Sequence, residues 1–130
     1  MTTATELLAP FVDQRTVLLT TYKRDGTGVG TPVSIAVDGD HAYVRTWHTA
    51  GKAKRLRNNP EVEVEPSTVT GKATGPGFHA RARLLDGAEA RHAAKLLGGK
   101  NKILQGFLVP AFHRLRGYKT LHYELTPSSD

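Results

Sequence analysis

Two Asp-Gly pairs, at residues 25–26 and 38–39, divide the first third of the chain into three short β-prone runs. The runs cover residues 16–26, 29–40 and 41–47. Asp-Gly is a frequent hairpin connection, because its glycine readily adopts the positive φ that tight turns between strands require. The three runs are therefore predicted to form an antiparallel meander.

Alternating apolar and polar side chains assign one face of each predicted strand to a core. In the second run, Val33, Ile35 and Val37 alternate with Ser34 and Ala36. The same period of two recurs in further segments, whose inward residues are expected to be Ala42, Val44 and Thr46 in 41–47, Val62 and Val64 in 61–65, Ala80, Ala82 and Leu84 in 79–85, and Leu121, Tyr123 and Leu125 in 118–125.

Helical segments are predicted between these strands, with Thr49 as the N-cap of one helix and Pro60 enforcing its end. Pro110 is expected to kink another. The sequence predicts about six strands with short helices inserted between them and shows no βαβ repeat. We therefore expect a mainly-β chain that forms a β-barrel with additional short helices. We expect one domain over residues 1–130. The predicted helices cover 4–13, 50–58, 87–98 and 102–116.

The residue inventory argues against several kinds of chemistry. The chain has no cysteine, hence no thiolate nucleophile, and no Gly-x-Ser-x-Gly motif. Its six histidines are scattered without a His-Glu-x-x-His pattern, so no metal site is predicted. No run approaches the roughly 18 apolar residues that cross a membrane. The N-terminus lacks a signal-peptide pattern, so we expect a cytoplasmic protein without a membrane partner.

The most basic stretch, residues 45–57, holds five Lys and Arg and no carboxylate. On the predicted helix, Lys52 and Arg55 form one row, and Lys54 and Arg57 form a second. The helix start, with Lys52 at its mouth, offers backbone N–H groups to an anion, and the net charge of +6 also favours anionic partners. A solvated basic face explains the same charges, and the charges alone favour it. No recognition-helix pattern or interleaved aromatics support a nucleic-acid partner.

Four segments, taken in order, resemble a known superfamily. They are TPVSIA at 31–36, VRT at 44–46, KAKRLRNNP at 52–60 and LHYELTP at 121–127. Their order and spacing resemble the flavin-binding split β-barrels of the pyridoxine phosphate oxidase type, and more narrowly the deazaflavin (coenzyme F-420)-dependent reductases among them. The resemblance covers the chain from about residue 17 to residue 127. It implies a split β-barrel homodimer with two cofactor sites at the subunit interface, each using residues of both chains.

The resemblance also implies cofactor-binding roles for individual residues. One group would run along the ring system, a second would contact the ring or the ribityl chain, and a third would hold the phosphate and form a basic rim. In that order, the groups are Thr31, Pro32, Val33 and Ser34; Arg45, Thr46 and Trp47; and Thr49, Ala50, Gly51, Lys52, Lys54 and Arg55.

Three departures favour coenzyme F-420 over FMN. Superfamily members that bind FMN typically carry basic side chains at the positions of Thr31, Ala36 and Gly51. The lactyl-phosphate and acidic tail of F-420 suit a broad basic rim. The resemblance thus implies an oxidoreductase that transfers hydride between F-420 and a small unsaturated or carbonyl-bearing substrate. An FMN-dependent oxidase or reductase, and a non-catalytic cofactor- or haem-binding module, are the alternatives.

No catalytic residue stands out in the sequence. Tyr43, His48 and Tyr123 are candidate proton donors, although a packing or surface role accounts for each of them more readily. The protein is expected to supply mainly orientation and electrostatics to a bound cofactor.

Overall fold

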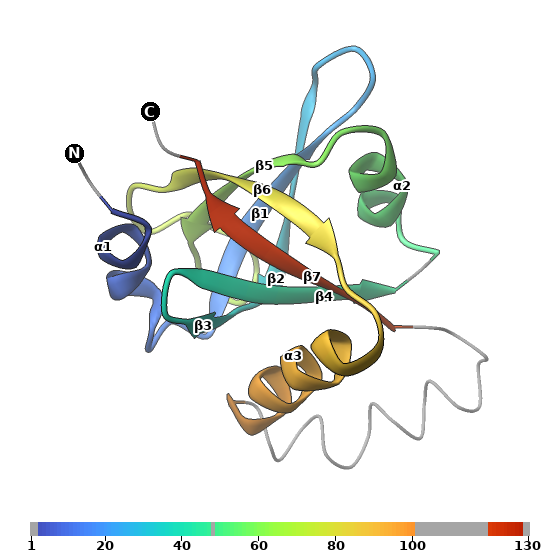
Figure 1. Cartoon of the computed structure of the whole chain (residues 1–130). Coiled ribbons are helices and arrows are strands. Elements are labelled where there is room, and N and C mark those ends of the chain that lie inside the picture. The colour runs from blue at the N-terminus through green and yellow to red at the C-terminus, as the bar shows by residue number, and fades with distance from the viewer. Residues whose placement is uncertain (1–2, 48, 101–119, 129–130) are drawn as a thin grey trace.

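The computed structural model describes residues 3–47, 49–100 and 120–128. Within them, seven strands form one curled antiparallel sheet, with helices at its ends and against one outer face (Figure 1). The elements are α1 (Ala4–Leu8), η1 (Ala9–Phe11), β1 (Thr16–Tyr22), β2 (Gly28–Ser34), β3 (Ala36–Asp38), β4 (His41–Trp47), α2 (Gly51–Asn58), β5 (Glu61–Pro66), β6 (Phe78–Leu84), α3 (Gly87–Lys100) and β7 (Thr120–Pro127).

The strand order β2-β1-β5-β6-β7-β4-β3 explains why the sheet curls. Its two end strands, β2 and β3, are consecutive in the chain and are separated only by Ile35. Because a single residue links the two edge strands, the sheet has to bend until its opposite edges meet. Accordingly, β2 and β4 contact each other without being hydrogen-bonded neighbours in the sheet. This seam between β2 and β4 leaves the described barrel split.

The predicted meander is therefore wrong in one respect. The β1–β2 and β3–β4 hairpins form, but the run over residues 29–40 divides at Ile35 into two strands that belong to opposite ends of the sheet. The described chain accordingly has seven strands rather than about six. Turn chemistry fixes neighbouring pairs, whereas the remaining pairings depend on burial of apolar faces that are distant in sequence.

The barrel interior contains the predicted inward faces of the strands. Val44, Val62, Val64 and Leu125 are at most 1% exposed, and α1 and η1 close one end with Leu8 and Phe11. Leu84 departs from the prediction and is exposed, because β6 ends there. The next residue, Leu85, is buried instead, in a second cluster beneath α3 that also contains Ala36, Tyr43, Ala93 and Leu97.

The predicted helices are recovered where the structure describes them. Residues 4–11 form α1 followed by a 3-10 turn that contains Pro10, and residues 51–58 and 87–100 form α2 and α3. The predicted helix over 102–116 lies outside the described residues. None of the described helices is long and apolar enough to cross a membrane.

Candidate functional site

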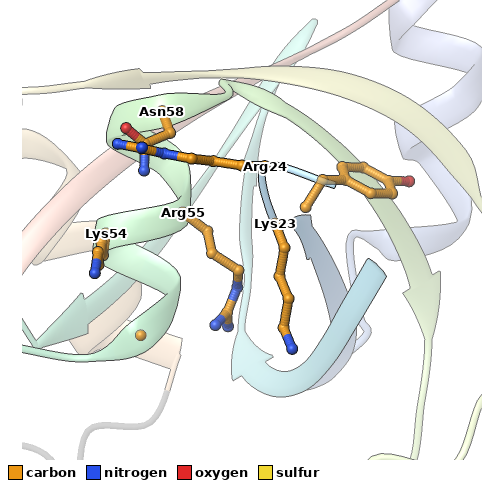
Figure 2. Close-up of a pocket in the computed structure, with 7 residues that line it drawn as sticks. Lys23, Arg24, Lys54, Arg55 and Asn58 are labelled. Carbon is orange, nitrogen blue, oxygen red and sulfur yellow. The ribbon is translucent and has the colours of Figure 1, made fainter. Parts of the chain in front are cut away.

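A pocket of about 430 Å³ lies between α2 and the turn of the β1–β2 hairpin (Figure 2). Two segments that are distant in sequence form its walls. One is the end of β1 with the hairpin turn, and the other is one side of α2. We call it the α2 pocket. It is lined by Tyr22, Lys23, Arg24, Gly51, Lys54, Arg55 and Asn58.

Backbone hydrogen bonds fix the turn that carries Lys23 and Arg24. The Lys23 N–H donates to the Thr27 carbonyl at 2.9 Å, and the Gly26 N–H donates to the Lys23 carbonyl at 2.9 Å. Gly26 has a φ of 89°, in the left-handed region that glycine adopts without strain. The first Asp-Gly pair therefore determines where these two cationic side chains leave the backbone.

Arg55 is held in the pocket by a buried residue of β1. Its Nε donates a hydrogen bond of 2.6 Å to Oγ1 of Thr21, which is 0% exposed. A Cβ atom at position 51 would lie 2.9 Å from Nη1 of Arg55, so the glycine leaves room for the guanidinium group beside the helix start. Figure 2 shows the Arg55 and Lys23 side chains extending in the same direction from their two elements.

The described residues that line the α2 pocket include four cations and no carboxylate. Lys52 adds to this positive field from a half-buried position, where burial and the neighbouring Arg55 charge lower the pKa of its ammonium group. Tyr22, which also lines the pocket, has a pKa that is raised by burial and then by the charges of Glu63 and Glu65. An anionic group in the pocket would offset the repulsion among its cations.

The structure brings together only part of the predicted phosphate-binding group. Gly51, Lys54 and Arg55 line the α2 pocket, whereas Lys52 lies beside it. The N-cap prediction for Thr49 is wrong. The N-cap is Ala50, which has an extended backbone and no side-chain cap, and its carbonyl accepts hydrogen bonds from the N–H groups of Ala53 and Lys54. The helix thus begins one residue later than predicted.

Thr31 and Thr46 place unpaired hydroxyl groups on the two strands that flank the seam. Alternation puts Thr31 on the same face of β2 as the core residue Val33, and Thr46 on the same face of β4 as Val44. Within the described part of the chain, neither buried Oγ1 atom has a hydrogen-bond partner. Buried polar atoms normally have partners, so these hydroxyl groups suit a polar ligand that enters the seam.

Arg45 and Thr46 cannot point the same way, because successive side chains of a strand lie on opposite faces. Thr46 is directed to the barrel interior, and Arg45 and Trp47 are directed to the outer face of β4. In β2, Pro32 and Ser34 alternate in the same way with Thr31 and Val33. The predicted ring-contacting residues are therefore divided between two faces of the sheet.

The described candidate proton donors lie in packed surroundings. The Tyr43 hydroxyl donates to Asp38 at 3.3 Å and lies 2.9 Å from Nε2 of His41, and burial together with the Asp38 charge raises its pKa to about 12. Tyr123 is part of the barrel core, and burial raises its pKa. His48 lies outside the described residues. Among the described residues, no group of three or more His, Asp or Glu side chains is arranged to hold a metal ion.

Sequence reasoning missed the contribution of the first hairpin to the pocket. Tyr22, Lys23 and Arg24 were assigned only to a strand end and a turn, and Asn58 only to a helix end. The available signal was the Lys-Arg pair directly before the Asp-Gly turn. It indicates an exposed basic hairpin tip, but nothing local indicates that the tip faces α2, because β1 and α2 are separated by three strands in the sequence.

Comparison with solved structures identifies the same fold at low sequence identity. A Listeria innocua protein, provisionally described as a pyridoxamine 5'-phosphate oxidase, is 16% identical over 97% of this chain and 94% of its own, with a TM-score of 0.68. HutZ, a haem storage protein of Vibrio cholerae, is 16% identical over 100% of this chain and 93% of its own, with a TM-score of 0.67. A protein described as an F-420 reductase is 15% identical over 92% of both chains, with a TM-score of 0.58.

These similarities confirm the predicted split β-barrel of the pyridoxine phosphate oxidase type. The fold is shared by proteins described as an oxidase, a haem store and an F-420 reductase, so the fold alone does not fix the activity. No family model matches the sequence, and a comparison with curated proteins found no significant match.

Proposed function

We propose that this protein is an oxidoreductase that binds coenzyme F-420 and transfers hydride between it and a small unsaturated or carbonyl-bearing substrate. The observation that carries the proposal is the α2 pocket, whose described lining has four cations and no carboxylate. The pocket adjoins a barrel that has unpaired hydroxyl groups at its seam. These features match a cofactor that combines a polar ring system with a phosphate and an acidic tail.

The α2 pocket would hold an anionic group of the cofactor. Arg24, Lys54 and Arg55 offer charge-assisted hydrogen bonds, which are shorter and stronger than neutral ones. Arg55 is already oriented by its bond to Thr21, so little side-chain freedom is lost when the ligand binds. Lys52 is half-buried beside the positive charge of Arg55, and a bound anion would give its ammonium group a neighbour of opposite charge.

The chain's own part in the reaction is binding and orientation. Bound F-420 supplies the hydride chemistry itself. Thr31 and Thr46 would hydrogen-bond polar atoms of the ring system from the barrel interior, and the cations of α2 would fix the other end of the molecule. With both ends of the cofactor fixed, its ring would be held in one orientation toward the second substrate. Holding two reactants in the right geometry raises the reaction rate.

The choice of F-420 over FMN is supported by what the pocket lacks as well as by what it contains. Gly51 contributes space rather than a cation, and the basic residues Lys23, Arg24 and Lys54 spread charge over a wider area than a single phosphate needs. A ligand with two separated anionic groups uses that area better than FMN does. We also propose a homodimer, in which the second copy would complete each cofactor site.

Fluorescence titration of the purified protein with F-420, FMN and haem tests the proposal directly. We expect micromolar or tighter binding of F-420, and an affinity at least about tenfold weaker in an Arg24→Gln, Lys54→Gln double variant, which corresponds to a loss of about 1.4 kcal/mol. A Lys95→Gln variant, on the exposed side of α3, is the matched control and should bind normally. Absence of F-420 binding, or a resident yellow flavin, would overturn the cofactor assignment.

Hydride transfer needs a separate measurement. Oxidation of reduced F-420 by small enone, quinone or nitro-aromatic acceptors can be followed by the return of the cofactor's absorbance. Binding without turnover of any acceptor would contradict the enzymatic proposal and would leave a cofactor-binding module.

A further inference from the structure

Arg45 and His122 lie directly opposite each other in the antiparallel pair formed by β4 and β7. Their neighbours along the strands, Val44 and Tyr123, face the barrel core, so alternation directs both side chains to the outer face of the sheet. Directly opposed side chains in antiparallel strands are close enough to interact, with Cβ atoms about 4.5–5.5 Å apart. The two side chains therefore form one local site.

Both side chains of this pair have a buried polar atom without a partner. Nη2 of Arg45 and Nε2 of His122 are inaccessible to solvent, and neither makes a hydrogen bond within the described part of the chain. A buried group that lacks its partner is costly, and most of all when it belongs to a charged side chain. The pair is thus a place where a ligand atom would gain interactions that the described chain does not supply.

Other arginines on the same outer face have carboxylate partners. Arg81 lies 2.9 Å from Glu61, and Arg83 lies 2.7 Å from Glu89 and 3.3 Å from Glu124. No carboxylate is paired with Arg45 among the described residues. The stretch 101–119 contains no Asp or Glu, so its side chains carry no carboxylate for this arginine either.

We propose that Arg45 and His122 form a binding site for the carboxylate or phosphate group of a small-molecule ligand, on the outer face of β4 and β7 and separate from the α2 pocket. The α2 pocket is lined by the β1–β2 hairpin and α2, and neither Arg45 nor His122 is among its lining residues. The inference gives Arg45 a role different from the ring contact that the resemblance implies, and it does not depend on F-420 being the cofactor.

An oxygen atom of such an anion would accept hydrogen bonds from Nη2 of Arg45 and from a protonated Nε2 of His122. Arginine suits this role because its guanidinium group keeps its charge and presents donors in a fixed plane. Burial lowers the pKa of Arg45, and burial followed by the Arg45 charge lowers the pKa of His122. A bound anion would stabilise the charged forms of both side chains and so raise both pKa values, and this stabilisation favours binding.

The side-chain nitrogen signals of His122 give a site-specific readout. We would titrate the uniformly ¹⁵N-labelled full chain with inorganic phosphate, and separately with acetate, at constant ionic strength. The His122 signals are assigned by their loss in a His122→Gln variant. We expect a saturable shift of these signals with at least one of the two anions, and the difference between the anions indicates whether the ligand group is a phosphate or a carboxylate.

Three variants separate this site from the alternatives. Arg45→Gln should weaken the His122 response at least tenfold, and Arg45→Lys, which keeps the charge, should weaken it less. Arg81→Gln removes an exposed arginine that already has a partner, and should leave the response unchanged. The Arg24→Gln, Lys54→Gln variant should also preserve it, even where it abolishes F-420 binding, so the two proposals can fail independently.

Two outcomes would overturn the inference. One is the absence of a saturable His122 shift with either anion, or an equal response in the Arg45→Gln protein. The other is a wild-type dimer whose His122 does not respond to added anions and which dissociates on the Arg45→Gln change in analytical ultracentrifugation. That result would assign the missing partner to a carboxylate of a second copy rather than to a small molecule.

Discussion

Arg55 and Thr21, which are 34 residues apart, are joined by a 2.6 Å hydrogen bond between the Arg55 Nε and the Thr21 Oγ1. The bond connects α2 to the buried face of β1 and sets the direction of a guanidinium group that lines the α2 pocket. One fully buried hydroxyl group thus positions a cation at the candidate site.

Thr21→Val should loosen Arg55 without disrupting the barrel. Valine has nearly the same shape but accepts no hydrogen bond, so we expect a loss of about 0.5–1.5 kcal/mol in the free energy of unfolding. F-420 affinity should fall as well, because Arg55 loses its orientation. Urea unfolding and cofactor titration measure the two effects. Thr20→Val, on the opposite face of β1, is the control, and an equal loss of affinity there would refute the anchoring role.

Gly51→Ala should change binding more than stability. The new Cβ would meet Nη1 of Arg55 at 2.9 Å, and the flexible guanidinium group would move away. Alanine is favoured over glycine in a helix by up to about 1 kcal/mol, so thermal stability should be unchanged or higher. Cofactor affinity should be lower. Thr49→Ala should leave thermal stability unchanged, because Thr49 is exposed and does not cap α2.

Gly77→Ala should destabilise the fold. A Cβ at this position would collide with the Val64 carbonyl oxygen, which belongs to a paired strand and cannot swing aside as a side chain does. We expect a loss of about 1–3 kcal/mol, the range seen when atoms are forced into a packed interior. Gly98→Ala in α3 has open space around its Cβ and should gain about 0.5–1 kcal/mol. Differential scanning calorimetry of both variants tests the contrast.

Asp38 should make part of the stability depend on pH. A hydrogen bond with His92 is the largest cause that lowers the pKa of Asp38, with further contributions from the Tyr43 hydrogen bond and the His41 charge. A carboxyl group whose pKa is lower in the folded state stabilises it above the unfolded-state pKa of about 3.9, and this contribution disappears as the pH falls through the folded-state value.

The wild-type protein should therefore be more stable than an Asp38→Asn variant near pH 6. The two proteins should converge as the pH falls below the folded-state pKa of Asp38, where the carboxyl group is protonated in both the folded and the unfolded states. Urea unfolding monitored by the fluorescence of Trp47, the single tryptophan, gives both stability curves. A difference that stays constant from pH 6 to pH 3 would show that the carboxylate charge does not contribute.

Local sequence signals predicted the strands and α2 because each depends on a few neighbouring residues. Asp-Gly turns set the β1–β2 and β3–β4 hairpins, alternation identified the inward valines of β5, and Pro60 marked the end of α2. The same signals failed at Ile35 and at Leu84. There, a strand changes partners or ends for reasons that lie in other parts of the sheet.

The basic residues of α2 show how far the sequence reaches into the site. Their number and helical spacing were readable, and they predicted an anion-binding role that stays a prediction. The sequence did not show which of them line a pocket, because Lys54 and Arg55 do so only together with Lys23 and Arg24 of a distant hairpin. The resemblance to deazaflavin reductases named Arg45 but not His122, the residue that the β4–β7 register places opposite it.

The sequence by itself determined the period of each strand, the turns and the positive charge of the segment around α2. Those properties follow from backbone preferences and side-chain chemistry that act over a few residues. Only the tertiary structure decided the strand order, the seam between β2 and β4, and the pairing of Arg45 with His122. These depend on burying apolar faces from the whole chain at once, and no short segment contains that information.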